Sequence, residues 1–342
     1  MKAFKRFGKN IINFIDENIK ELIFILGVYV VLTYQLPYFI LVSGGTIAVD
    51  DRVEIEEEYS QDGSFNLAYV DQINATLPTY LLSKVIKSWT VYSVSDYTYD
   101  DEEDEREVDL RDNMELNSSI QSAVKVAYLE AGKEFNIDEY HHYIYYVDES
   151  IKDSGLLVGD EILSINNKEF TDLDEFKKEI NNQEVGDKVL IKYKRNKKIK
   201  EKELVVRKES DRKIVGLMVL TLYDYETKPK ISFKFQDREG GSSGGLTLAL
   251  AIYNKLIEED ITQGYKIVGT GTIDEDGNVG EIGGVTYKLK GAVKKKADIF
   301  IVPNGDNYKE AKEEQEKHNY KIDIIGVDTF SDAVNELKNY KK

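Results

Sequence analysis

Two adjacent serines, Ser242 and Ser243, lie inside the glycine-rich run Gly240–Gly245, of sequence GGSSGG. By composition alone such a run is typical of a flexible linker. Its setting argues otherwise, because it joins the strand-like segment 231–235 directly to the apolar segment 246–259, which has the pattern of a helix. Glycines let the backbone approach a ligand, and a helix start offers unpaired N–H groups. A serine there can act as a nucleophile whose neighbouring amides hold an oxyanion.

A phosphate-binding loop is the competing interpretation of this glycine run. The pattern G-x-x-x-x-G-K followed by Ser or Thr is absent from all 342 residues, so no nucleotide site is predicted. The chain has 46 Lys and Arg against 63 Asp and Glu, for a net charge of −17. This balance argues against a nucleic-acid partner, because binding to polyphosphate depends on clustered Lys and Arg.

The residue that would activate such a serine is harder to choose. The only histidines are His141, His142 and His318, and two adjacent residues of an extended chain point to opposite faces. A Ser-His-Asp triad or a histidine-rich metal site is therefore disfavoured. Lysine is the remaining strong candidate, and it must be desolvated to be neutral. Composition cannot choose one lysine among many.

Metals, cofactors and disulfides are not predicted. The chain has no Cys, which excludes a cysteine nucleophile, a disulfide scaffold and zinc sites built on thiolates. The acidic run 100–105, DDEEDE, lacks the glycine turn and the ligand spacing of a calcium loop, and we expect a solvated, self-repelling loop.

The N-terminal region predicts a membrane anchor. No charge occurs from Leu22 to Val49, and residues 22–42, LIFILGVYVVLTYQLPYFILV, are long enough for a spanning helix, although Pro37 interrupts the pattern. Residues 1–21 hold five basic and three acidic side chains, so the positive-inside rule places them in the cytoplasm. We expect a single-pass protein of the cell membrane with an extracellular catalytic domain and the lipid bilayer as a partner. A cleaved signal peptide is the alternative, but the apolar run is too long for one and no clean cleavage site closes it.

Residues 43–142 are expected to form a membrane-proximal α/β region. Ser118-x-x-Gln121 resembles a capping box, which marks a helix start. The apolar residues that follow at helical spacing are Ile120, Ala123, Val124, Ala127, Tyr128 and Ala131. The pattern predicts a helix that ends near Gly132 and serves packing.

Residues 143–209 consist of short strand-like runs separated by turns. The stretch Ser154–Asn166 matches the pattern S-G-L-x-V-G-D-x-I-x-x-I-N, and the segment resembles a PDZ domain of the type found in exported proteases. The resemblance implies a mainly-β domain that binds an extended peptide by adding it as a strand to a sheet edge. A spacer that binds nothing is the alternative, because a fold does not dictate a function.

Three spaced motifs follow in order along the C-terminal third. Gly240–Leu246 matches G-G-P-S-A-G-L, Thr270–Val279 matches T-G-x-I followed by D-G-x-V, and Ile282–Lys288 matches I-G-G-[VIL]-x-x-K. Residues 240–311 resemble the proteolytic domain of Lon proteases, and the whole chain resembles the membrane-anchored PDZ–Lon-type serine proteases of Gram-positive bacteria. The resemblance implies an α+β proteolytic domain over 210–342.

The same resemblance assigns the catalytic residues. Ser243 falls on the nucleophile, Lys288 on the catalytic lysine, and Thr270 on the threonine that orients it. Ser242 and Gly244 replace the proline and alanine of the motif, which gives the loop more backbone freedom. Arg238 and Glu239 replace an Asp-Ile pair, which affects the substrate pocket more than the chemistry.

The expected fold is therefore multidomain, with an N-terminal transmembrane helix, a mainly-β PDZ domain and an α+β Lon-type proteolytic domain. The resemblance implies an ATP-independent extracytoplasmic serine endopeptidase that cleaves exported or signalling peptides or proteins near the membrane with a Ser-Lys dyad and no cofactor. The alternative is a catalytically inactive, membrane-anchored PDZ adaptor that binds peptides. Retention of the serine, threonine and lysine in their motifs weighs against it.

Overall fold

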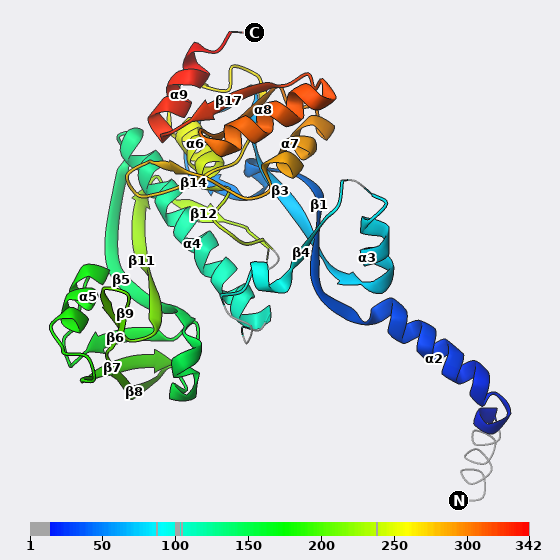
Figure 1. The fold of residues 1–342 in the computed structure, drawn as a ribbon. Helices are drawn as coiled ribbons and strands as arrows, with labels where there is room; N and C mark the ends of the chain where they lie inside the picture. Colours follow the sequence, from blue (N-terminus) through cyan, green and yellow to red (C-terminus); the bar gives the residue numbers. More distant parts are fainter. Residues whose placement is uncertain (1–13, 87, 100–102, 104, 237–238, 342) are drawn as a thin grey trace, which may run out of the picture. The chain divides into compact units, whose positions relative to one another are not determined.

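The computed structural model describes residues 14–86, 88–99, 103, 105–236 and 239–341 (Figure 1). They form two compact units. The smaller unit comprises the residues up to 43 and Val70–Tyr97, and the larger unit comprises Gly44–Tyr69 and Thr98–Lys342. Most of the acidic run 100–105 lies outside the described residues. Of the two residues that are described, Glu103 is buried and forms an ion pair with Arg111, and Glu105 is the first residue of a helix, so neither fits the predicted solvated loop.

In the smaller unit, the segment predicted to span a membrane is a helix followed by a strand. Helix α2 (Ile19–Thr33) has 15 residues, which is about 22 Å at 1.5 Å per residue and short of the ~30 Å of a bilayer core. Tyr34 already has an extended backbone, and Pro37 has no N–H with which to continue a helix. Strand β1 (Gln35–Ala48) then pairs antiparallel with strand β4 (Thr90–Ser93).

No helix within the described ranges is both long and apolar enough to cross a membrane. The predicted transmembrane helix over 22–42 is therefore wrong. The single-pass location in the cell membrane with a cytoplasmic N-terminus and an extracellular catalytic domain, and the bilayer as a partner of the N-terminal helix, are corrected with it. The other elements of this unit are helix α3 (Leu77–Ser83) and the 3₁₀ turn η2 (Val94–Asp96).

The C-terminal part of the larger unit, which carries Ser243 and Lys288, is built on a parallel sheet. Its strands lie in the order β17, β16, β13 and β3. Their bounds are Asp323–Val327, Ile299–Pro303, Lys266–Gly269 and Ser64–Thr76. Strand β3 comes from the segment predicted to form a separate α/β region, and its first residues pair with β13.

Helices cover both faces of this sheet. One core joins it to α4 (Glu105–Glu130), α6 (Gly245–Leu256) and α9 (Phe330–Asn339). A second core joins the opposite face to α7 (Val285–Lys294) and α8 (Asp306–His318). Alternation along β16 explains the division, because Ile299 and Ile301 lie in the first core and Phe300 and Val302 in the second.

The apolar stripe predicted from Ile120 to Ala131 packs in the first core, where Ala131 is partly buried and the other five residues are buried. The helix that carries it begins earlier, however, at Glu105 and not at the predicted capping box near Ser118. The remaining small elements are η1 (Val49–Asp51), the antiparallel pair β2 (Val53–Ile55) and β12 (Ile231–Phe233), and the antiparallel pair β14 (Thr272–Ile273) and β15 (Val279–Gly280).

A five-stranded antiparallel sheet with its own core follows α4 in the chain. Its strands lie in the order β11, β5, β6, β7 and β8. Their bounds are Leu217–Lys228, Glu134–Val147, Glu161–Ile165, Lys188–Arg195 and Lys198–Val205. Helix α5 (Leu173–Asn181), the turn η3 (Glu149–Ser154) and the hairpin of β9 (Arg207–Glu209) and β10 (Arg212–Ile214) complete it.

Strands β5 and β11 connect this sheet to the part built on the parallel sheet as one long ladder (Figure 1). Pairing runs from Leu217↔Val147, at the core of the small sheet, to Lys228↔Glu134. Near its far end the ladder packs Phe135 and Tyr225 against the first hydrophobic core. The register shifts between Met218 and Val219 and again between Asp224 and Tyr225.

Candidate active site

The loop that carries Ser243 lies at the start of α6. Gly241 has φ +81°, a conformation that suits glycine, and Gly244 is the N-cap of the helix. The carbonyl oxygen of Ser243 accepts hydrogen bonds from the Gly271 N–H at 2.8 Å and from Thr270 Oγ1 at 3.0 Å. The N–H groups of Ser243 and Gly244 have no acceptor among the described residues, so they are available to a ligand oxygen.

Lys288 is the buried cation of the site. It lies in the first turn of α7 and is 4% exposed. Its Nζ donates to Thr270 Oγ1 at 3.1 Å. Burial lowers the pKa of Lys288 to about 8 from an ordinary 10.5, and no carboxylate offsets this effect. The amine is therefore half neutral at about pH 8 and mostly neutral above it.

Thr270 joins the other two predicted residues. It is fully buried, and its one hydroxyl proton is committed to the carbonyl oxygen of Ser243. Thr270 Oγ1 can therefore only accept from Lys288, which fixes one N–H of the amine. The structure brings Thr270 and Lys288 into direct contact, but the hydroxyl of Ser243 makes no hydrogen bond to Lys288 Nζ within the described contacts.

Ser242, the neighbouring serine, has different partners. Its Oγ donates to Glu115 Oε2 at 3.3 Å, and its carbonyl oxygen accepts from Ser119 Oγ at 3.1 Å. Both partners lie on α4. Ser242 is thus hydrogen-bonded to helix α4, which packs beside the loop, whereas Ser243 is hydrogen-bonded to Thr270. No sequence motif predicts Glu115 or Ser119, and the only sequence signal for them is that polar residues recur on one face of a helix predicted for packing.

The Arg238–Glu239 pair, expected to alter the substrate pocket, is only partly described. Arg238 lies outside the described residues. Glu239 forms an ion pair with Arg52, which lies next to β2. The pocket prediction for this pair therefore stays a prediction.

The three histidines lie away from these residues. His142 is buried in the five-stranded antiparallel sheet, where its Nδ1 lies 2.9 Å from Thr221 Oγ1 and its Nε2 lies 3.1 Å from the carbonyl oxygen of Phe170. Burial lowers the pKa of His142. His318 stacks on Tyr320 near the end of α8. None of the three contacts Ser243, Thr270 or Lys288 in the part of the chain that the structure describes.

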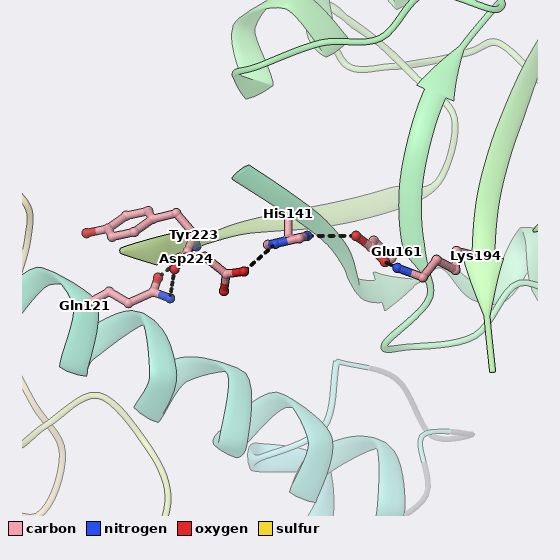
Figure 2. Close-up of polar contacts among 6 residues, drawn as sticks. All are labelled: Gln121, His141, Glu161, Lys194, Tyr223 and Asp224. Atoms are coloured by element: carbon pink, nitrogen blue, oxygen red, sulfur yellow. Dashed lines mark hydrogen bonds and ion pairs between the residues drawn. The ribbon is translucent and has the colours of Figure 1, made fainter. Parts of the chain in front are cut away.

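His141 belongs to a polar chain across the sheet (Figure 2). Its Nδ1 lies 2.8 Å from Glu161 Oε1 and its Nε2 lies 3.4 Å from Asp224 Oδ2, while Lys194 donates to Glu161 Oε2 at 2.7 Å. Burial lowers the pKa of His141, but the contacts with Glu161 and Asp224 outweigh it and the net shift is upward. This histidine therefore binds three strands together and takes no part in the candidate active site.

Helix α4 also closes part of the sheet edge (Figure 2). The Gln121 side chain donates to the Tyr223 carbonyl oxygen at 2.8 Å and accepts from the Tyr223 N–H at 3.3 Å. Tyr223 lies on β11, an edge strand of the sheet. One side-chain amide thus occupies the hydrogen-bonding position that another strand would take.

Two domain families match the chain. Residues 132–206 match the PDZ domain, and residues 237–338 match the Lon protease (S16) C-terminal proteolytic domain. Residues 237–338 thus correspond to a proteolytic domain of the Lon type of serine protease. With the PDZ domain on the same chain, the protein has the domain composition of the PDZ–Lon-type proteases.

Solved structures similar to this chain include two PDZ domains of SdrC-like proteins. The one from Listeria monocytogenes is 23% identical, with 25% of this chain and 93% of that chain covered and a TM-score of 0.23. The one from Listeria innocua is 28% identical, with 23% of this chain and 92% of that chain covered and a TM-score of 0.22. A search of the curated proteins found no match.

Proposed function

We propose that this protein is an ATP-independent serine endopeptidase that cleaves peptides or accessible protein segments with a Ser243–Lys288 dyad. The observation that carries the proposal is the buried Lys288, held by Thr270, whose hydroxyl also holds the backbone of Ser243. A buried amine without a carboxylate partner is a suitable proton acceptor near neutral pH. The chain contains no phosphate-binding loop, which supports cleavage without nucleotide hydrolysis.

The reaction follows from these positions. Ser243 Oγ attacks the scissile carbonyl carbon as its proton passes to Lys288 Nζ. The N–H groups of Ser243 and Gly244 receive the oxyanion of the tetrahedral intermediate. When the C–N bond breaks, the Lys288 ammonium gives its proton to the leaving amine. Water then attacks the ester carbon, again losing a proton to Lys288, and the acid product leaves as Ser243 recovers its hydrogen.

Thr270 has a positioning role in this scheme. The Thr270 hydroxyl donates its hydrogen bond to the Ser243 carbonyl oxygen, so its oxygen can only accept from Lys288. This contact fixes one N–H of the neutral amine and leaves the lone pair of Lys288 free for the serine hydroxyl. The same threonine fixes the backbone that presents the nucleophile. One hydroxyl therefore sets the position of both members of the dyad.

The PDZ domain supplies the second part of the proposal, a peptide-binding edge. Strands β11 and β8 are the two edges of its sheet. Strand β8 presents mostly exposed, charged residues, a pattern that discourages strand addition, whereas the start of β11 is apolar. An extended peptide would pair with β11 between Leu217 and Leu222, up to the position that Gln121 occupies.

A covalent probe tests the catalytic proposal against the alternative of an inactive peptide-binding adaptor. Purified protein should react with a serine-directed fluorophosphonate and should cleave members of an unstructured peptide library. Ser243→Ala should lose both reactions, and Lys288→Arg should lose turnover because a guanidinium cannot accept the proton. Ser242→Ala keeps the proposed nucleophile, so it should still be labelled, and its label should map to Ser243. An unlabelled, inactive wild-type protein, or label at Ser242, would contradict the proposal.

A further inference from the structure

One carboxylate joins the PDZ domain to the loop that carries Ser243. Glu115 lies on α4, between the two. Its Oε1 accepts a hydrogen bond from the hydroxyl of Tyr145, which is on PDZ strand β5, and its Oε2 accepts from Ser242 Oγ at 3.3 Å. Ser242 is covalently next to Ser243. A single side chain thus bridges a strand of one domain and the nucleophile loop of the other.

Tyr145 is directed at α4 by a break in the β-ladder. Pairing passes from Met218↔Tyr146 to Val219↔Ile144, so Tyr145 is an extra residue with no partner on β11. Such a bulge re-aims the side chain it carries. The ring of Tyr145 lies beside the Arg111 guanidinium, with 5.9 Å from the guanidinium carbon to the ring centroid. Arg111 and Glu115 are one helical turn apart, so both engage the same tyrosine.

The donor state of Tyr145 is also secured. Burial first, and then the contact with Glu115, raise the pKa of its hydroxyl. The phenol therefore keeps its proton at any pH at which the enzyme would work. A protonated phenol facing a carboxylate makes a charge-assisted hydrogen bond, which is stronger than one between neutral groups.

Helix α4 holds the nucleophile loop at three points along one face. The Asp112 carbonyl oxygen accepts from the Gly241 N–H at 2.9 Å, Glu115 accepts from Ser242, and Ser119 donates to the Ser242 carbonyl oxygen. Positions 112, 115 and 119 recur at helical spacing and so lie on one side of the helix. Of these three contacts, the one at Glu115 also reaches the PDZ domain.

We propose that Glu115 is a positioning residue through which strand β5 of the PDZ domain sets the pose of Ser243. The peptide-binding edge proposed above includes Met218 and Val219, directly opposite the bulge, so a peptide added there acts on the strand pair that aims Tyr145. The inference rests on the proposed function, because it takes Ser243 as the nucleophile and β11 as the peptide edge.

A double-mutant cycle tests this link. Tyr145→Phe removes one bond of Glu115 and Ser242→Ala removes the other. Each should slow fluorophosphonate labelling of Ser243 and lower kcat on a short peptide by roughly three- to tenfold, with KM little changed. Because either substitution already breaks the link from Tyr145 through Glu115 to Ser242, the double variant should lose no more labelling rate or kcat than the worse single variant. Labelling reads the nucleophile directly and does not require the PDZ edge.

Matched variants separate positioning from folding. Ser242→Thr keeps the hydroxyl and should restore most of the rate that Ser242→Ala loses. Tyr143→Phe changes a tyrosine of the same strand that makes no hydrogen bond to α4 within the described contacts, and it should behave as wild type. Thermal unfolding should show that every variant is folded. Losses that multiply in the double variant, or wild-type rates in both single variants, would overturn the inference while leaving an active Ser243 and the proposed function intact.

Discussion

The protonation state of Lys288 should set the pH dependence of turnover. Its pKa is lowered to about 8 by burial, and in the proposed mechanism only the neutral amine can accept the Ser243 proton. We expect kcat/KM to rise with pH and to level off above a midpoint of about 8. Rates on an uncharged peptide between about pH 6 and pH 10 would measure this limb. A midpoint near the ordinary histidine value of ~6.5 would implicate a different base.

The same burial has a cost in stability. The folded-state pKa of Lys288 is below the unfolded value of 10.5, so between the two the unfolded chain binds more protons and stability rises with pH. Below both values the full cost is present, on the order of 3 kcal/mol. Lys288→Met should therefore raise the free energy of unfolding by ~1–3 kcal/mol at neutral pH, although it abolishes activity.

Denaturant unfolding of Lys288→Met at several pH values checks this sign. The gain over wild type should shrink through about pH 8 to 10.5 and vanish above it. A gain that is independent of pH would show that methionine merely packs better. Lys290→Met, on the same helix but with its amine paired to Glu314, is the control and should give no such gain.

At this scale the sequence predicted what local motifs contain. Ser243, Thr270 and Lys288 each lie in a short pattern, and the structure places Thr270 against both of the others. Glu115 has no such pattern, because its partners Tyr145 and Ser242 are 30 and 127 residues away. Contacts of that separation arise only when α4, β5 and the loop that carries Ser243 have folded together.

Among the elements, the crossing of α6 over α4 depends on a glycine. A Cβ on Gly245 would lie 2.6 Å from Ser119 Oγ and 2.9 Å from Ile273 Cγ2. We expect Gly245→Ala to destabilise the fold by about 1–3 kcal/mol and to slow labelling of Ser243, because α6 must move with the loop at its start. Gly283→Ala is the control, since nothing lies within 4 Å of its Cβ. Equal Tm values for the two variants would contradict this expectation.

Two elements show why local patterns misplaced boundaries. Ser118-x-x-Gln121 has the composition of a helix start but lies inside α4, which begins at Glu105. The apolar face of α4 packs on α6, and this packing stabilises the helix on both sides of the motif. Residues 22–42 have the composition of a membrane helix, yet pairing with β4 draws Tyr38–Leu41 into a strand. Hydropathy counts apolar residues and does not record whether a partner strand is present.

For the whole molecule, the PDZ edge should decide which substrates are cleaved well. Tyr223 N–H and C=O point to the free edge, so the alternation of a strand places those of Thr221 and Val219 on the same side. Val219→Pro removes one of these donors without removing a bond to β5. We expect KM for a long unfolded substrate to rise about tenfold while kcat/KM for a short peptide stays within about twofold. Equal losses on both substrates would assign the change to folding.

The ladder of β5 and β11 also makes it possible to remove or replace the PDZ domain. The chain enters the PDZ domain through β5 and leaves it through β11, and Tyr140 and Tyr223 are paired residues of these two strands. Facing residues of an antiparallel pair have Cα atoms only ~5 Å apart, a gap that a two-residue turn closes. This pair of strands is therefore a site at which one domain can be exchanged for another. Removing the PDZ domain and rejoining the two strands there would leave the Lon-type domain alone. Inserting a different ligand-binding domain at the same place would make proteolysis depend on that domain's ligand.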